Sequence, residues 1–215
     1  GVKGQDRQLV GIIQRNATWM LSLVNQLLDF NRIGDKKLQL RAAQGDIVAP
    51  LKGIAELFKF NAGAKGIEFQ THGLEDSFPM WADVDKVQKI VMNLLSNAMK
   101  FTPTGGRVTL SFDVVPRDEA SAAFQLTKAD TDTQYALITV ADTGRGIPDG
   151  ELEKIFERFY QADNQGDTHG SGIGLYYARA LAGMHHGYIK AANRAEGGAV
   201  FSLLLPVSAS SYTED

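Results

Sequence analysis

The run from residue 93 to residue 100 reads Asn-Leu-Leu-Ser-Asn-Ala-Met-Lys and decides the fold. Apolar residues at helical spacing extend into this run from Val84, and Asp83 is a residue type that caps helix N-termini. We therefore predict a helix that begins after Asp83 and ends near Phe101.

Three polar residues share one face of this helix. At 100° per residue, Asn93, Asn97 and Lys100 lie beside the apolar face. Asparagine inside a helix costs up to ~0.7 kcal/mol relative to alanine, so two of them one turn apart require an explanation. Their amide oxygens suit a hard cation such as Mg²⁺, and the lysine suits phosphates that share the cation. A solvated face, with a lysine near the helix C-terminus, explains the same pattern.

A glycine-rich turn, Asp142-Thr-Gly144-Arg-Gly146, comes directly after a predicted buried strand. Its glycines allow a sharp turn and a close approach to a ligand, and Asp142 could accept a hydrogen bond from an exocyclic amine. An ordinary Asp-Thr-Gly turn at the end of a strand is the alternative.

A second glycine-rich turn contains Gly170, Gly172 and Gly174 and opens a predicted helix. Backbone amides at a helix N-terminus, free of side chains, form a cradle for an anion. The spacing matches neither the Rossmann fingerprint nor a P-loop, so a plain tight turn remains an equal alternative.

The remaining pattern alternates between helices and strands, which favours a mixed α and β class. Asp46 can cap a further helix, and Gly187 is expected to provide a left-handed cap after the last one. The polar stretch 116–133 predicts a loop, and the tail from Ser208 is expected to fray. We predict strands at 67–71, 108–114, 135–140, 188–191 and 200–205, and helices after Asp46, at 152–160 and at 175–184.

A separate apolar stripe runs from Leu9 to Phe30. Its steps of four and three residues predict one long amphipathic helix with a coiled-coil seam. The stripe is wider than a two-helix contact needs, so we expect it to pack against another chain or a further helix.

The composition excludes several classes of protein. The absence of cysteine excludes a disulfide scaffold and a thiolate metal site, and a net charge of -3 argues against a nucleic-acid partner. No apolar run approaches the ~20 residues of a membrane-spanning helix, and no signal-peptide pattern is present. We expect a soluble, cytoplasmic module.

Four motifs follow one another in order: the asparagine helix, the turn at 142–146, the run 155–160 (Ile-Phe-Glu-Arg-Phe-Tyr) and the turn at 170–174. This order resembles the N, G1, F and G2 boxes of bacterial sensor histidine kinases, in the ATPase superfamily shared with gyrase, MutL and the heat-shock chaperone. Residues 93–103 are nearly a family consensus. The resemblance implies an α+β fold: an α/β sandwich of the histidine-kinase ATPase type, with helices on one face of a mixed sheet, plus a long N-terminal helix.

The resemblance also implies a role for each motif. Asn97 would ligate Mg²⁺, Asn93 would lie beside it near the γ-phosphate, and Lys100 would contact the phosphates. Asn93 and Lys100 are then the catalytic candidates, and Asp142 would bind the adenine amino group. The other implied nucleotide contacts are Phe101, Gly144, Gly146, Gly170, Gly172 and Gly174.

The same resemblance implies a division of the chain. Residues 1–45 would be the second helix of a dimerisation and phosphotransfer hairpin with its linker, 46–207 the catalytic ATP-binding domain, and 208–215 a polar tail. Residues 157–171 would form a mobile lid over the nucleotide, with Phe156 and Phe159 anchoring its base.

The histidine that accepts the phosphoryl group in this family has no counterpart in the chain. We interpret His72, His185 and His186 as structural, the last two at a helix end that favours an imidazolium. His169, beside the glycine cradle, is either a phosphate contact or a solvated lid residue. The implied reaction passes the ATP γ-phosphoryl group to a histidine on a helix absent from this chain, so we expect no autophosphorylation.

Other functions remain open. The chain could be a nucleotide-binding module without kinase activity, a hydrolytic dimerising ATPase, or only a dimerisation element. Asn93 stands where the hydrolytic relatives carry a glutamate that activates water, and an amide cannot act as that base, which favours transfer. The implied partners are ATP, the acceptor helix of the same kinase, a response regulator receiver domain in a two-component phosphorelay, and a second copy in the full-length protein, which a segment absent here could anchor to a membrane.

Overall fold

The computed structural model describes residues 39–127, 130–161 and 171–212. The chain divides into two units, residues 1–39 and 40–215, and nearly all of the described residues belong to the second. The predicted helix with its seam from Leu9 to Phe30 therefore lies outside the described residues, as do Gly170 and His169.

A five-stranded sheet forms the centre of the second unit, in the order β2-β4-β5-β7-β6. Strand β2 (Glu68–His72) pairs parallel with β4 (Arg107–Pro116), and β4 pairs antiparallel with β5 (Gln134–Asp142). Strand β7 (Ala199–Pro206) then lies antiparallel between β5 and the edge strand β6 (Tyr188–Asn193). Because one pair is parallel and three are antiparallel, the predicted mixed sheet is confirmed.

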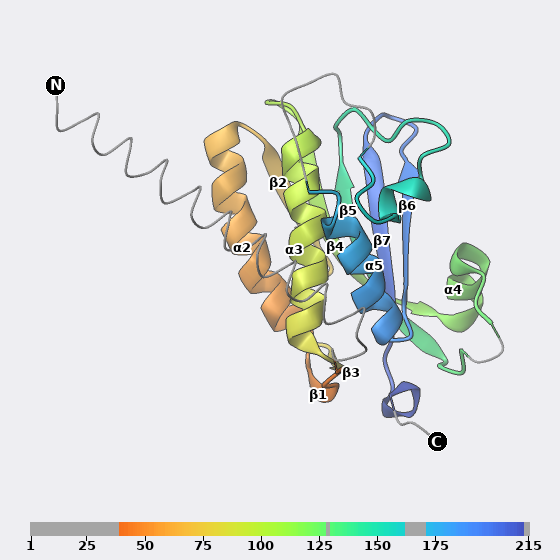
Figure 1. The fold of residues 1–215 in the computed structure, drawn as a ribbon. Coiled ribbons are helices and arrows are strands. Elements are labelled where there is room, and N and C mark those ends of the chain that lie inside the picture. The colour runs from red at the N-terminus through yellow and green to blue at the C-terminus, as the bar shows by residue number, and fades with distance from the viewer. Residues whose placement is uncertain (1–38, 128–129, 162–170, 213–215) are drawn as a thin grey trace, which may run out of the picture. The chain divides into compact units, whose positions relative to one another are not determined.

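Three helices cover one face of this sheet (Figure 1): α2 (Val48–Lys65), α3 (Val84–Phe101) and α5 (Gly174–Met184). Alternate residues of the strands are buried between the two layers, since side chains on a strand point in turn to opposite faces. The buried members include Val108, Leu110, Phe112, Ala136, Ile138 and Val140. The chain is thus an α/β sandwich, as predicted.

Helix α3 matches its prediction at both ends. The carboxylate of Asp83 accepts a hydrogen bond from the Lys86 backbone N–H at 3.2 Å, which caps the first turn. The helix ends at Phe101 because Pro103 disfavours helical geometry at Thr102. Asp46 also binds a helix start, accepting the Val48 N–H at 2.9 Å from one residue outside the N-cap.

Short elements escaped the sequence analysis. Strands β1 (Ala43–Asp46) and β3 (Pro79–Ala82) form a separate antiparallel pair. The predicted loop at 116–133 is wrong in part, because it contains helix α4 (Arg117–Phe124). This helix is stabilised by tertiary contact, with two of its residues buried in a small cluster: Val115, Ala120, Phe124, Tyr135 and Leu204.

Two other local predictions are wrong. The stretch 152–160 holds only a single 3-10 turn, η1 (Lys154–Phe156). The tail does not fray over its described part, residues 208–212, because Asp132 binds it. The carboxylate of Asp132 accepts hydrogen bonds from the backbone N–H of Ser208 at 3.0 Å, from the Ser208 hydroxyl and from the Ser211 hydroxyl at 3.1 Å, next to the turn η2 (Ala209–Ser211).

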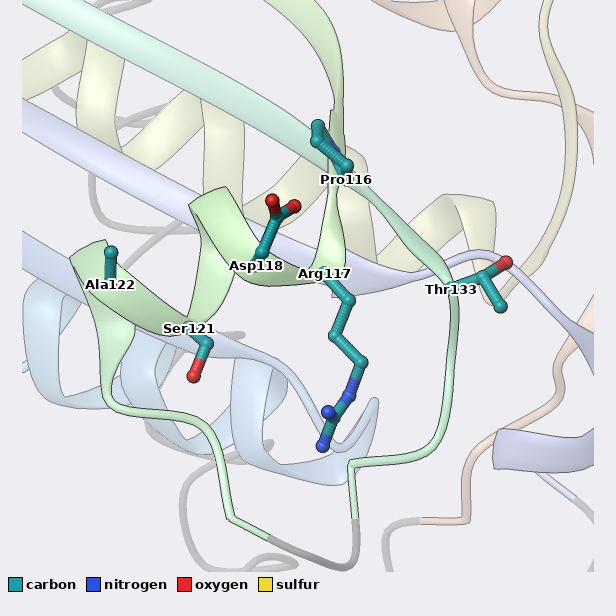
Figure 2. Close-up of a pocket in the computed structure, with 6 residues that line it drawn as sticks. All are labelled: Pro116, Arg117, Asp118, Ser121, Ala122 and Thr133. Atoms are coloured by element: carbon teal, nitrogen blue, oxygen red, sulfur yellow. The ribbon is translucent and has the colours of Figure 1, made fainter.

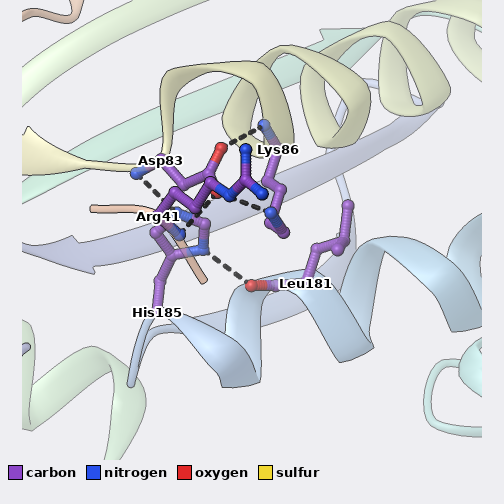
Figure 3. A network of polar contacts seen from close by, with 5 residues as sticks. All are labelled: Arg41, Asp83, Lys86, Leu181 and His185. Carbon is purple, nitrogen blue, oxygen red and sulfur yellow. Dashed lines mark hydrogen bonds and ion pairs between the residues drawn. The ribbon is translucent and has the colours of Figure 1, made fainter. Parts of the chain in front are cut away.

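His185 is fully buried where α5 ends against the start of α3 (Figure 3). Its Nδ1 lies 2.8 Å from the Leu181 carbonyl oxygen and must donate, while Nε2 accepts the Asp83 backbone N–H at 3.2 Å. The ring is therefore a neutral Nδ1–H tautomer. Burial lowers the pKa of His185, against the opposing effect of the Leu181 contact and the charge of Asp83. The expectation of an imidazolium at this helix end is wrong for His185.

The left-handed residue after α5 is His186, with φ 53°, so the expectation that Gly187 takes this conformation is wrong. Gly187 is needed for a different reason: an added Cβ would lie 2.4 Å from the carbonyl oxygen of Leu204 on β7. The glycine lets the chain turn from α5 into β6 against the sheet.

The same corner holds the residues where the chain enters and leaves the unit. The backbone N–H of Arg41 donates to the Asp83 carboxylate at 2.9 Å, and the Lys86 ammonium lies 2.5 Å from the same oxygen (Figure 3). The ring of Tyr212 packs edge-on against His185, with centroids 6.1 Å apart. Within the described part of the chain, no helix is long and apolar enough to cross a membrane.

Candidate functional site

The asparagine face of α3 lies beside the start of α5. Asn93, Asn97 and Lys100 are half-buried, whereas the neighbouring Ser96 is exposed. An added Cβ at Gly174 would lie 3.0 Å from the Asn93 amide oxygen, so the absence of a side chain at 174 allows the two elements to approach. The structure therefore brings the asparagine motif and the second glycine motif together.

Asp142, the last residue of β5, lies on the same face of the strand as the buried Ile138 and Val140, because alternate side chains of a strand point to the same face. Its side chain therefore points toward the helical layer. Only 4% of it is exposed. Its Oδ1 accepts the backbone N–H of Gly144 at 2.8 Å and of Ala199 at 3.4 Å. Burial raises the pKa of this carboxyl group, and these two hydrogen bonds oppose the rise.

The turn after Asp142 packs against the C-terminal end of α3. An added Cβ at Gly144 would lie 2.5 Å from the carbonyl oxygen of Phe101, a distance that no larger residue tolerates. The first glycine motif thus joins the site at Phe101, about two turns along α3 from Asn93.

Two cations flank the ring of Phe101. The Lys100 ammonium lies 5.0 Å from the ring centroid and the Arg145 guanidinium 4.7 Å from it. Burial lowers the pKa of Lys100, and the nearby charge of Arg145 adds to this effect. Positive charge therefore gathers at the end of α3, where an anion would relieve the repulsion between these side chains.

The start of α5 has the features of an anion cradle. Its N-cap residue, Ile173, makes no side-chain capping hydrogen bond, and Gly172 adopts φ +67°. An α-helix N-terminus presents unpaired backbone amides and a partial positive charge. Of the three glycines predicted here, Gly172 and Gly174 take part in this geometry, and Gly170 lies outside the described residues.

The run 155–160 contacts the same glycine turn through its backbone. The Phe159 N–H donates to the Gly172 carbonyl oxygen at 3.0 Å. Phe156 is buried, with its ring 6.4 Å from that of Phe201 on β7, and so fits its predicted anchoring role. Phe159 is 53% exposed, and since residues 162–170 lie outside the described part, its role at the base of the lid stays a prediction.

Two residues at the β6–β7 turn that no sequence motif marks hold the Asp142 loop. The amide of Asn193 makes two hydrogen bonds to the backbone of Ile147, and the Arg194 guanidinium donates to the Asp142 carbonyl oxygen at 3.1 Å. No local signal marks them, because they meet the loop only when β6 and β5 join one sheet. Arg145 stands within the first glycine motif, but the motif alone does not indicate that its side chain lies over Phe101.

Another hollow of the surface belongs elsewhere (Figure 2). It lies where β4 leads into α4, and six residues line it: Pro116, Arg117, Asp118, Ser121, Ala122 and Thr133. Pro116 pairs with Gln134 at one end of the β4–β5 ladder, whereas Asp142 pairs with Val108 at the other. The hollow therefore contains none of the predicted site residues.

The site offers amide oxygens rather than a carboxylate cluster to a metal ion. Among the residues that the structure describes, no group of three or more His, Cys, Asp or Glu side chains could hold a metal. One amide oxygen supplemented by phosphate oxygens and water suits Mg²⁺, which keeps part of its hydration shell. The half-buried Asn97 fits such a role.

Comparison with protein families decides the assignment. Residues 82–209 match the model of histidine kinase-, DNA gyrase B- and HSP90-like ATPases. The chain belongs to this family. The matched residues include α3, the Asp142 loop and α5, which together form the candidate site.

Relatives of this ATPase domain are histidine kinases. The chain is 35% identical to hybrid signal transduction histidine kinase D of Dictyostelium discoideum, over 94% of this chain and 12% of that protein. It is 33% identical to the sensor histidine kinase TmoS of Ectopseudomonas mendocina, over 92% of this chain and 19% of that one. The chain thus spans less than a fifth of the length of these relatives.

Solved structures agree. Full-length ShkA in complex with AMPPNP has a TM-score of 0.71 and 29% identity, covering 94% of this chain and 39% of that one. The catalytic domain of the histidine kinase ThkA, in a nucleotide-free form, has a TM-score of 0.62 and supports the fold at 21% identity, covering 80% of this chain and 99% of that one. The chain thus contains an ATP-binding catalytic domain of the histidine-kinase type, a domain found in signalling proteins.

Proposed function

We propose that Mg-ATP binds along α3, between the Asp142 loop and the start of α5, and that its γ-phosphoryl group passes to a histidine on a helix outside the catalytic domain. The observation that carries this proposal is the double contact made by α3: Gly174 approaches Asn93, and Gly144 approaches the Phe101 carbonyl. These two approaches lie about two turns apart along α3, which supports a nucleotide whose base lies near Asp142 and whose phosphates lie near the start of α5.

Each residue of the site has a distinct proposed role. The Asp142 carboxylate accepts a hydrogen bond from the adenine amino group on Oδ2, because the backbone N–H groups of Gly144 and Ala199 donate to Oδ1. Phe101, Gly144 and Gly146 line the base, and the amides near Gly172 and Gly174 bind phosphate oxygens. Gly170 is proposed as a further member of this cradle.

Asn93, Asn97 and Lys100 are proposed to act on the phosphates. Mg²⁺, when bound, neutralises phosphate charge, and the Asn97 amide oxygen would hold it. Lys100 binds phosphate oxygens, and Asn93 orients the γ-phosphoryl group from the same helix face. Phosphoryl transfer depends on positioning and charge neutralisation, so no protein nucleophile is needed in this domain.

The proposed partners follow from this reaction. Residues 1–45 are proposed to supply the second helix of a dimerisation hairpin, the acceptor histidine to lie on its first helix, and a response regulator receiver domain to take the phosphoryl group onward. The catalytic domain is proposed to span 46–207 and to work in a homodimeric, cytoplasmic portion of the kinase. Residues 208–215 are proposed as a polar tail.

A calorimetric titration of residues 1–215 with ATP, with and without Mg²⁺, tests nucleotide binding. We expect magnesium-dependent affinity that falls about tenfold or more in Asn97→Ala, because a ligand to the cation is lost. Ser96→Ala, at the exposed neighbouring position on α3, is the matched control and should leave the affinity unchanged. Undiminished affinity in Asn97→Ala contradicts the proposed site.

Radiolabelled ATP separates transfer from the other candidate activities. We expect no stable label on residues 1–215 alone, and label on the dimerisation hairpin of the parent kinase when it is added. Nucleotide affinity without transfer to that hairpin would indicate a binding module. Steady phosphate release that depends on Asn93 would indicate a hydrolytic ATPase.

A further inference from the structure

A side chain of the β6–β7 turn holds the loop that follows Asp142. Asn193, the last residue of β6, donates from Nδ2 to the Ile147 carbonyl oxygen at 2.7 Å. Its Oδ1 accepts the Ile147 backbone N–H at 2.8 Å. The two residues are 46 positions apart in sequence, so these hydrogen bonds join segments that only the folded sheet brings together.

The same turn also holds the other end of the loop. Arg194 donates to the Asp142 carbonyl oxygen at 3.1 Å, and the Ala199 N–H reaches the Asp142 carboxylate at 3.4 Å. Gly198, with φ +87°, lies so near that an added Cβ would be 2.0 Å from the Asp142 carbonyl oxygen. Residues 193–199 therefore hold the loop at Asp142 and again at Ile147.

The loop needs this external support. Gly144 and Gly146 give it no side chains to fix its conformation, and glycine is the residue with the greatest backbone freedom. Gly146 adopts φ +74°, and an added Cβ there would lie 3.0 Å from the Asn193 amide oxygen. Asn193 itself is exposed, where a hydrogen bond adds little to global stability, so its effect falls mainly on the loop.

We propose that Asn193 is a positioning residue for base selection: by clamping Ile147 it fixes the loop so that the Asp142 carboxylate meets the amino group of adenine. This inference rests on the proposed function of the site. Asn193 touches neither the base nor the phosphates in this account. It acts through the loop, and its removal lowers the preference for a base that bears an exocyclic amine.

Comparing ATP with ITP isolates this effect, because ITP carries a carbonyl where ATP has the amino group. Dissociation constants for both Mg-nucleotides are measured by calorimetry on residues 1–215. In Asn193→Ala we expect ATP affinity to fall about five- to tenfold and ITP affinity to change by less than about twofold, so the preference for ATP shrinks. Asn193→Asp keeps the acceptor for the Ile147 N–H but lacks the donor, and should lose part of the preference. Asn61→Ala, an exposed asparagine on α2, is the matched control and should keep it.

The outcomes are distinguishable. An unchanged ATP-to-ITP ratio in both Asn193 variants overturns the inference, as does an equal loss for the two nucleotides, which would indicate a merely structural role. Failure of the unaltered protein to bind ATP contradicts the proposed function instead. Thermal unfolding of each variant is recorded alongside, and a midpoint within about 2 °C of the parent is expected, since the side chain is exposed.

Discussion

At the scale of single residues, Asp142 shows how the alternation of side chains along a strand buries a charged group on the helical side of the sheet. The residue continues the inward-facing series of β5 and is 4% exposed, so its carboxylate is buried without an ion-pairing side chain in direct contact among the described residues. Burial raises its pKa, which means that the ionised form is costly in the folded protein. Such a cost agrees with the proposed role of this carboxylate in recognition, since burying the charge does not stabilise the folded protein.

Asp142→Asn should therefore separate stability from binding. The amide oxygen can still accept the N–H groups of Gly144 and Ala199, and no charge is buried, so the free energy of unfolding at pH 7 should stay equal or rise. The amide nitrogen cannot accept from an adenine amino group, so ATP affinity should fall by about 10- to 100-fold. Urea unfolding and calorimetry measure the two effects, and a parallel loss of stability and affinity would contradict the assignment.

The sequence was sufficient to predict Asp142, Asn93, Asn97 and Lys100 as candidates because each stands in a motif of consecutive residues. It was insufficient for Asn193 and Arg194, whose partners are backbone atoms of a loop reached only through the sheet. In the sequence, Asn193 and Arg194 read as an ordinary pair at a turn. Only the fold shows that Ile147 lies beside Asn193. The conformation of His186, which has a positive φ next to a glycine, was equally hidden.

At the scale of elements, α3 organises the molecule: its N-terminus is capped at the His185 corner and its C-terminal half carries the polar face of the site. Its ends were predictable from Asp83 and Pro103, since both signals are local. Helix α4 was not predictable, because eight residues, half of them polar, are too short to form a stable helix without the packing of Ala120 and Phe124. Likewise, 152–160 has helical composition, yet these nine residues form only one 3-10 turn.

Asp83→Ala should destabilise the protein by about 1–2 kcal/mol, because the helix loses its cap and the Arg41 N–H loses its acceptor. Asp85→Ala is the matched control: the residue is exposed in the first turn of the same helix and contributes only a few tenths of a kcal/mol through the helix dipole. Urea denaturation at pH 7.5 checks both variants. Equal effects from the two substitutions would show that the cap contributes nothing specific.

At the scale of the whole molecule, the buried His185 makes stability depend on pH. Burial holds its pKa below the ordinary value, so as pH falls through about 6.5 the unfolded chain binds a proton that the folded chain refuses. The stabilisation is fully present above that pH and is lost as pH falls toward the folded pKa. Protonation of Nε2 would break the hydrogen bond from the Asp83 N–H, while Asp83 favours and Lys86 opposes the added charge.

We expect the free energy of unfolding to drop between pH 7.5 and pH 5.5, with His185 contributing up to about 1.4 kcal/mol per pH unit below its unfolded pKa. In His185→Gln this pH dependence should shrink, whatever the variant's stability at pH 7.5. His72→Gln, at the exposed end of β2, is the control for a His-to-Gln change outside the core. Urea unfolding at several pH values gives the slopes, and an identical slope in His185→Gln would refute the assignment.

The corner around His185 links the two ends of the described unit to the start of α3. Arg41 and Tyr212 both attach there, one through the Asp83 carboxylate and the other through the imidazole ring, and α3 runs unbroken from that corner for 18 residues, about 27 Å. Such a rod would act as a lever arm: a tilt imposed at Arg41 would be carried to Lys100 and Phe101, at the proposed nucleotide site, because the helix has no break along its length.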